Sequence, residues 1–128
     1  INLLSRSNIM NKLLALGIFD KMTTQEQIKD EIIKEFQSSE EEVSKYEYLI
    51  AYVDYGSYEG TGYILMRDKE SGELYENHSG HCSCYGNEGQ FSPEKANLVY
   101  LQSDKFSCYC YGDENTLIRE YIKDLKNG

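Results

Sequence analysis

The stretch that most restricts the fold is YLIAYVDY, Tyr48 to Tyr55, which has aromatic and β-branched residues on both of its alternating faces. Successive side chains of a strand point to opposite sides of the sheet, so a strand with two apolar faces must be covered on both sides. The stretch therefore predicts a buried strand that lies centrally in a sheet.

Four other segments have the composition of strands. The first two are joined through Lys69–Gly72, where Gly72 supplies the positive φ of a hairpin turn. The last would place Cys108 and Cys110 on one face of the strand, because they are two residues apart. The four predicted strands are 61–67, 72–77, 98–102 and 106–111.

Helices are predicted near both ends of the chain. Residues 9–19 are apolar enough for a short helix that ends at Gly17, a residue suited to a left-handed C-terminus. Thr24 to Gln27 has the form of a capping box, which starts an amphipathic helix that ends near Ser38. Asp113 can cap a final amphipathic helix.

These elements predict one α+β domain, an antiparallel sheet of about five strands with N-terminal helices and a C-terminal helix packed on one face. A chain of 128 residues is long enough to bury one core. The expected organisation is a single domain 1–128, with a helical segment 1–38, an antiparallel β region 46–111 containing a Gly/Cys-rich loop, and a C-terminal helix 113–126.

The composition argues against two classes of binding partner, nucleic acids and membranes. The formal net charge of -9 opposes direct binding of nucleic acid, because such binding depends on Lys and Arg. No apolar run reaches the ~20 residues that span a bilayer, and Leu13–Phe19 is too short for a signal segment. We therefore expect a soluble, cytoplasmic protein without a membrane partner, whose cysteines in a reducing compartment are thiols or metal ligands.

The stretch GHCSCYG, residues 80–86, raises the question of a metal site. Structural zinc needs four ligands, usually thiolates and imidazoles. A C-x-C pair can chelate, but C-x₂₋₄-C is commoner, and buried thiols that pack as small hydrophobes explain the same pattern without any cofactor. The candidate ligands are His81, Cys82, Cys84, Cys108 and Cys110, with His78 as a substitute.

A catalytic interpretation of the same loop takes Cys82 or Cys84 as nucleophile and His78 or His81 as base. Such a pair needs hydrogen-bond contact and a third group that orients the imidazole. The candidate orienting residues are Asp54, Glu76 and Glu88. A second motif, the G-x-G within residues 56–62, lacks a following helix and a lysine, so tight turns explain it better than a phosphate site does.

Two motifs, GSYEGTGYILM (56–66) and GELYENHSGHCSCYGNEGQF (72–91) followed by SPE (92–94), resemble a family of small bacteriophage and prophage proteins. The resemblance covers roughly residues 46–95 and does not include Cys108 and Cys110. It implies a cytoplasmic setting in a bacterial host. It also implies an accessory protein that binds and inhibits or modulates a host protein, such as a CRISPR-type antiviral effector, rather than an enzyme.

Charge and aromatic content favour the same class of function. An acidic surface with tyrosines suits a basic or nucleic-acid-binding protein partner, because complementary potential speeds association and tyrosine gives rigid contact area. A small enzyme, or a ligand- or zinc-binding module at loop 78–84, is the alternative, and a homodimer is compatible with either. The candidate partner surface is Asp54, Tyr55, Tyr58, Glu59, Tyr85 and Glu88.

Overall fold

The computed structural model describes residues 12–55, 59–82, 85–108, 110 and 112–126. These residues form an α+β fold around a five-stranded sheet with the order β1-β2-β3-β4-β5. The first pair of strands is parallel and the other three pairs are antiparallel. The elements are β1 (Leu14–Gly17), α2 (Gln25–Phe36), α3 (Glu40–Val43), β2 (Tyr46–Val53), β3 (Gly60–Asp68), β4 (Leu74–His81), β5 (Glu94–Lys95), α4 (Leu98–Leu101) and α5 (Gly112–Lys123).

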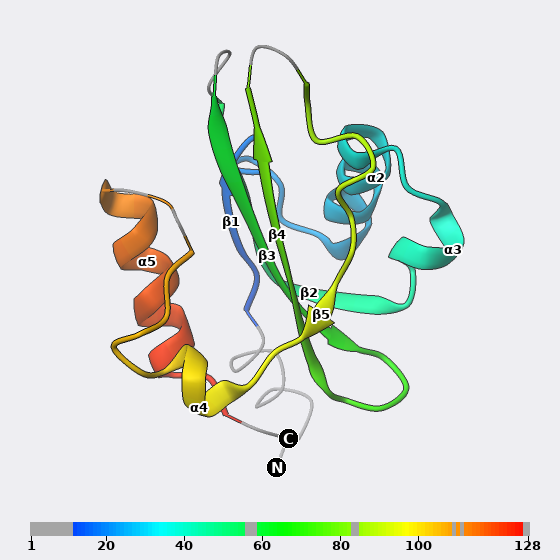
Figure 1. Cartoon of the computed structure of the whole chain (residues 1–128). Coiled ribbons are helices and arrows are strands. Elements are labelled where there is room, and N and C mark those ends of the chain that lie inside the picture. The colour runs from blue at the N-terminus through cyan, green and yellow to red at the C-terminus, as the bar shows by residue number, and fades with distance from the viewer. Residues whose placement is uncertain (1–11, 56–58, 83–84, 109, 111, 127–128) are drawn as a thin grey trace.

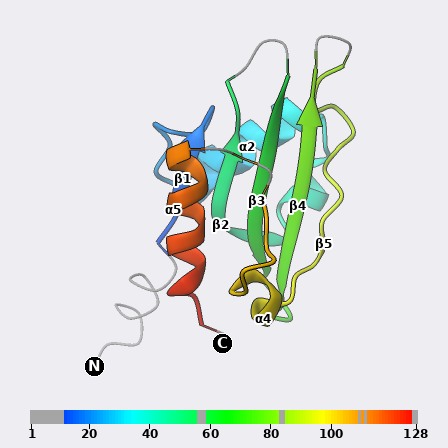
Figure 2. The same ribbon diagram turned by 60° about the vertical axis from the view of Figure 1, so that its left-hand side comes forward.

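Helices cover both faces of the sheet, so the prediction that they pack on one face was wrong. Figure 1 shows α2 and α3 on one side of the strands and α4 and α5 on the other, and the turned view in Figure 2 agrees. Each face has its own apolar cluster, one with Ile28, Ile32 and Phe36 of α2 and one with Ile118 and Ile122 of α5. Burial of both faces explains why β2 is apolar throughout.

The predicted central strand is confirmed. β2 is paired with β1 on one edge and with β3 on the other. Its register with β3 shifts between Tyr48 and Ile50, so Leu49 and Ile50 both face the α5 side, whereas Tyr48 faces α2. A bulge of this kind places two consecutive side chains on one face and lets β2 supply both clusters.

The helix predicted over 9–19 was wrong where the chain is described, because Leu14–Gly17 forms strand β1. An apolar run of this length fits a buried strand as well as a helix, and long-range pairing with β2 decides between them. Gly17 does take a positive φ of 63°, but at a strand end: the next amide donates to Val53 O over 2.9 Å, and a Cβ on Gly17 would overlap that carbonyl. Residues 9–11 lie outside the described residues.

Two predicted strands near the C-terminus were also wrong. Residues 98–101 form helix α4, which Asn97 caps by accepting a hydrogen bond from the Tyr100 amide. The described part of 106–111 has no regular structure up to Gly112, where α5 begins. Leu101 of the first segment and Phe106, Cys108 and Cys110 of the second are buried in the core, whereas Val99 and Tyr100 are exposed.

Other local signals are confirmed. Thr24 forms the complete capping box with Gln27 at the start of α2. The β3–β4 hairpin turns at Gly72, which has a φ of 75°. By contrast, the final helix begins at Gly112, so Asp113 lies in its first turn and not at the predicted cap position. A further short helix, Glu40–Val43, is capped by Ser39.

We predict that Gly17→Ala lowers the free energy of unfolding by about 2 kcal/mol or more, because alanine meets both a disfavoured φ and the Val53 carbonyl. Gly72→Ala is the matched control: it has a similar φ but open space around the new Cβ. Denaturant unfolding of both variants checks this, and equal losses would contradict the steric argument.

Tyrosines in the core make stability sensitive to alkaline pH. Burial raises the pKa of Tyr48 and of Tyr63, and raises that of Tyr121 to about 12. In the unfolded chain these tyrosines ionise near pH 10, before they do so in the folded protein. Their contribution to the free energy of unfolding is therefore fully present below about pH 10 and is lost as the pH rises towards 12 and beyond.

We therefore expect a tyrosinate absorbance titration in which the buried tyrosines ionise only together with unfolding, at a pH above the usual tyrosine pKa of about 10. Circular dichroism recorded on the same samples locates the unfolding step. Ionisation of all tyrosines near pH 10 with the fold intact would contradict this expectation.

Candidate functional site

The described residues of the His/Cys motif lie at and just beyond the end of β4. His81 is the last residue of the strand, and the Cys82 amide donates a hydrogen bond to the Tyr85 carbonyl over 3.0 Å. Ser83 and Cys84 lie outside the described residues. Cys82 is partly exposed.

Gln90 fastens the chain that follows this turn to the edge of β4. Its side-chain oxygen accepts a hydrogen bond from the Gly80 amide over 2.9 Å, and its side-chain nitrogen donates to the carbonyls of Gly80 and Gly86, each over 2.7 Å. The amide group thus pairs with Gly80 as a neighbouring strand would. Gln90, Gly80 and Gly86, which belong to or adjoin the His/Cys motif, therefore have a structural role in attaching this segment to β4.

Two buried asparagines complete this attachment. Asn77 donates to the Gln90 carbonyl over 3.1 Å and accepts from the Ser92 amide over 2.6 Å. Asn87 donates to Glu35 of α2 over 2.8 Å. These contacts, together with the 2.9 Å hydrogen bond from the amide of Gly89 to the carbonyl of Phe36, hold the loop against both β4 and the end of α2.

The glycines of the G-x-G motif lie in strand β3, opposite bulkier residues of β4. Gly60 pairs with His81 and Gly62 with Ser79. A Cβ on Gly60 would lie 2.6 Å from His81 Nε2, and one on Gly62 would overlap Ser79 Oγ. These glycines make room for cross-strand neighbours, so the turn explanation was wrong for this pair.

His78 and His81 lie on opposite faces of the sheet. His78 Nε2 is 3.2 Å from Glu76 Oε1, which also accepts a 3.0 Å hydrogen bond from the Tyr63 hydroxyl. Glu76, one of the three candidate orienting residues, therefore contacts His78. Cys82, however, lies four residues further along, ~13 Å at strand spacing, so His78 and Cys82 do not form a nucleophile–base pair.

Cys108 and Cys110 form a disulfide, which corrects the prediction that they are thiols or metal ligands. Both are buried in the cluster on the α5 side, whereas His81 faces α2 across the sheet, so the predicted ligand set is not assembled. Within the described ranges, no three His, Cys, Asp or Glu residues are arranged to hold a metal ion. Cys84 lies outside those ranges.

The Cys108–Cys110 ring is too small to stabilise the fold strongly. The two residues are separated by 2 in the sequence. Chain entropy gives about 1.6 kcal/mol for a three-residue loop, against about 3 kcal/mol for a fifteen-residue loop. The buried side chains of this segment, rather than its disulfide, anchor it to the core.

The predicted partner surface is gathered at one end of the sheet. Asp54 and Tyr55 follow β2, Glu59 precedes β3, and Tyr85 belongs to the turn after β4. Antiparallel pairing brings these points to the same end, at the top of Figure 1. Tyr58 lies outside the described residues, and Glu88 is exposed in the adjoining loop.

Two further acids at this end were missed by sequence reasoning. Asp20 follows β1 and accepts a 3.0 Å hydrogen bond from the hydroxyl of Tyr55. Glu114, in the first turn of α5, helps burial and Asp54 to raise the pKa of Tyr52. No local sequence pattern predicts either contact, because each depends on long-range packing.

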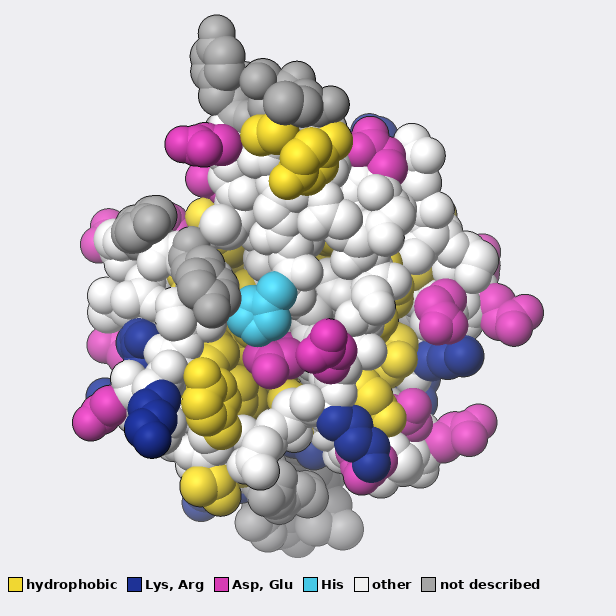
Figure 3. All heavy atoms as spheres, viewed as in Figure 1, with side chains coloured by type: hydrophobic (Ala, Val, Ile, Leu, Met, Phe, Trp, Pro, Cys, Tyr) yellow, Lys and Arg dark blue, Asp and Glu magenta, His cyan; other side chains and the backbone are white. Residues whose placement is uncertain are grey.

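We call this surface the acidic end and define it by Asp20, Asp54, Tyr55, Glu59, Tyr85, Glu88 and Glu114. The side chains of Tyr55 and Tyr85 are 66% and 61% exposed. Figure 3 shows exposed hydrophobic side chains at this end with acidic groups to either side. The combination offers negative potential and aromatic contact area on adjacent loops.

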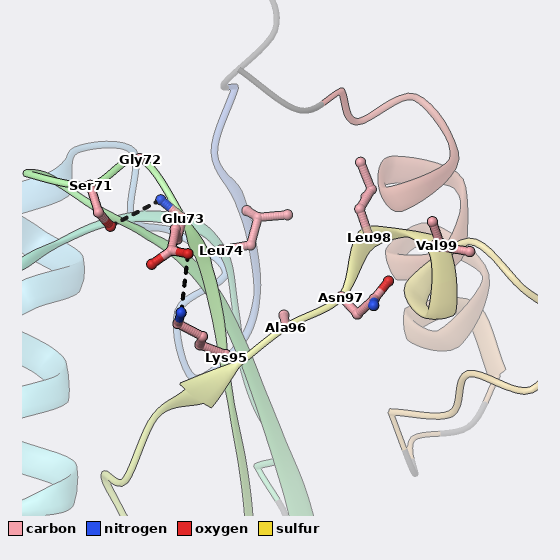
Figure 4. Close-up of a pocket in the computed structure, with 9 residues that line it drawn as sticks. All are labelled: Ser71, Gly72, Glu73, Leu74, Lys95, Ala96, Asn97, Leu98 and Val99. Atoms are coloured by element: carbon pink, nitrogen blue, oxygen red, sulfur yellow. Dashed lines mark hydrogen bonds and ion pairs between the residues drawn. The ribbon is translucent and has the colours of Figure 1, made fainter.

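A pocket of about 360 Å³ lies near the opposite end of the sheet (Figure 4). Its rim carries an ion pair between Glu73 and Lys95, 3.1 Å apart, and its wall includes Leu74 and Leu98. None of the residues predicted from the sequence as a site lines this pocket. Lys95, which lines this pocket, is already paired with Glu73. The acidic end is therefore the stronger candidate for a binding site.

Comparison with protein-family models, with curated proteins and with solved structures gave no match to this chain. In the part of the chain that the structure describes, no helix is long and apolar enough to cross a membrane.

We predict that Gln90→Ala lowers the free energy of unfolding by about 1–3 kcal/mol, because three hydrogen bonds to backbone groups are lost. Gln90→Glu keeps the shape and one acceptor but places a carboxylate against two carbonyls, so it should destabilise at least as much. Thermal unfolding compares the two variants, and a Gln90→Glu protein as stable as the natural one would contradict the assigned contacts.

Proposed function

We propose that this protein is a nonenzymatic accessory protein, of phage or prophage origin, that binds a basic host protein through the acidic end and modulates its activity. The observation that carries the proposal is the convergence of acidic side chains with two exposed tyrosines, Tyr55 and Tyr85, on neighbouring loops.

Hydrogen bonds hold the two tyrosines themselves in place. The hydroxyl of Tyr55 donates to Asp20, and the carbonyl of Tyr85 accepts from the amide of Cys82. Gln90 and Asn87 fix the following segment to β4 and α2. A surface ordered in advance loses less conformational entropy on binding, which favours affinity.

Charge supports a basic partner. The net charge of -9 and the acids around the tyrosines attract positive surfaces and speed the encounter. Tyrosine faces bind Lys and Arg side chains by cation–π contact as well as by apolar area. A host protein that binds nucleic acid through a basic channel has the matching surface, and the proposed target is such a protein of an antiviral, CRISPR-type system in the bacterial cytoplasm.

We predict that charge reversal at the acidic end abolishes partner capture. Tagged protein serves as bait in a bacterial lysate, in its natural form and as Glu59→Lys/Glu88→Lys, in which both changed residues are exposed. Glu41→Lys/Glu70→Lys is the control: it makes the same charge change at exposed positions near the opposite end of the sheet.

The expected result is one stoichiometric protein retained by the natural bait and by the control but not by the acidic-end variant, with retention falling as salt rises. Capture of the same protein by all three baits, or by none, would contradict the proposal.

A further inference from the structure

The Cys108–Cys110 disulfide lies between α4 and α5 in the chain. Cys108 is 1% and Cys110 is 7% exposed, whereas Ser107 and Gly112 are exposed. The pair is therefore buried close in sequence to exposed positions.

The core accommodates this pair in both oxidation states. Cys108 and Cys110 already pack among apolar side chains, and a free thiol behaves as a small hydrophobe in such a place. Asn115 Oδ1 lies 3.4 Å from Cys108 Sγ. A disulfide sulfur has no proton to donate, so this oxygen is an acceptor positioned for the thiol of the reduced form.

Folding protects this disulfide little against reduction. A disulfide that stabilises a fold strongly is, by linkage, one that the fold makes hard to reduce. A ring closed between residues two apart adds little to stability, so the reduced form competes on nearly equal terms.

From these observations we propose that Cys108 and Cys110 are a reversible redox pair, which a dithiol reductant opens without unfolding the domain. A thiolate of the reductant attacks Sγ of Cys110, the more exposed of the two residues, and the Sγ–Sγ bond breaks with Cys108 leaving as a thiolate. Cys108 takes a proton from water and donates to Asn115. The second thiol of the reductant then displaces Cys110 as its thiol, so the reductant is oxidised to a disulfide and the pair gains two electrons and two protons.

The cysteine pair lies close to the start of α5, so its reduction acts near this helix. Cys110 lies two residues before α5 begins, and Glu114 in the first turn of α5 belongs to the acidic end. Opening the ring releases the constraint on the segment that leads into this helix. The inference does not depend on the proposed partner, because it concerns the thiol chemistry of the isolated protein.

The test uses the full chain with Cys82→Ser and Cys84→Ser, so that only Cys108 and Cys110 react. The protein is equilibrated in buffers of varied ratio of reduced to oxidised dithiothreitol, quenched in acid, alkylated after denaturation and weighed. We expect a two-thiol transition that coincides whether approached from the oxidised or the reduced side, and a reduced form that still unfolds cooperatively on heating.

Asn115→Ala supplies a readout that a merely structural cysteine pair would not give: it should lower the Tm of the reduced form and leave that of the oxidised form nearly unchanged. Two thiols at every ratio, a disulfide that no ratio opens in the folded protein, or loss of the cooperative transition on reduction would each overturn the proposal. If Asn115→Ala fails to fold, the dithiothreitol titration and the melting of the reduced parent decide alone.

Discussion

The structure depends on strand β2, whose two faces are both apolar and must both be covered. Its residues supply the cluster against α2 and the cluster against α5, and the bulge after Tyr48 divides them between the two sides. Parallel neighbouring strands need a crossover connection, and α2 with α3 forms it between β1 and β2. The layer arrangement therefore follows from one eight-residue strand.

Sequence reasoning succeeded where the signal is local. The capping box at Thr24, the hairpin at Gly72 and the buried strand β2 are each set by side chains within a few residues. It failed where pairing is long-range: β1 became a strand only because β2 offers it an edge, and 98–101 became a helix although its composition suits a strand. Burial was predictable in these segments, but the element type was not.

The same difference between local and long-range signals applies to the candidate site. The loops that carry Asp54, Tyr55, Glu59 and Tyr85 were predicted to lie together, and antiparallel pairing brings them to one end of the sheet. Asp20 and Glu114 join them through β1 and α5, which no local pattern places there. The His/Cys motif drew attention by its composition, yet its described residues are used for a cross-strand pair and for a turn closed by Gln90.

The most direct test of the account is hydrogen–deuterium exchange of this protein in complex with the host protein that it captures. The account expects slower exchange in the described loops of the acidic end, around residues 54–55, 59–60 and 85–88, with no change at the β3–β4 turn, residues 68–73. Protection at that turn or on α4, with the acidic-end loops exchanging as in the isolated protein, would contradict it.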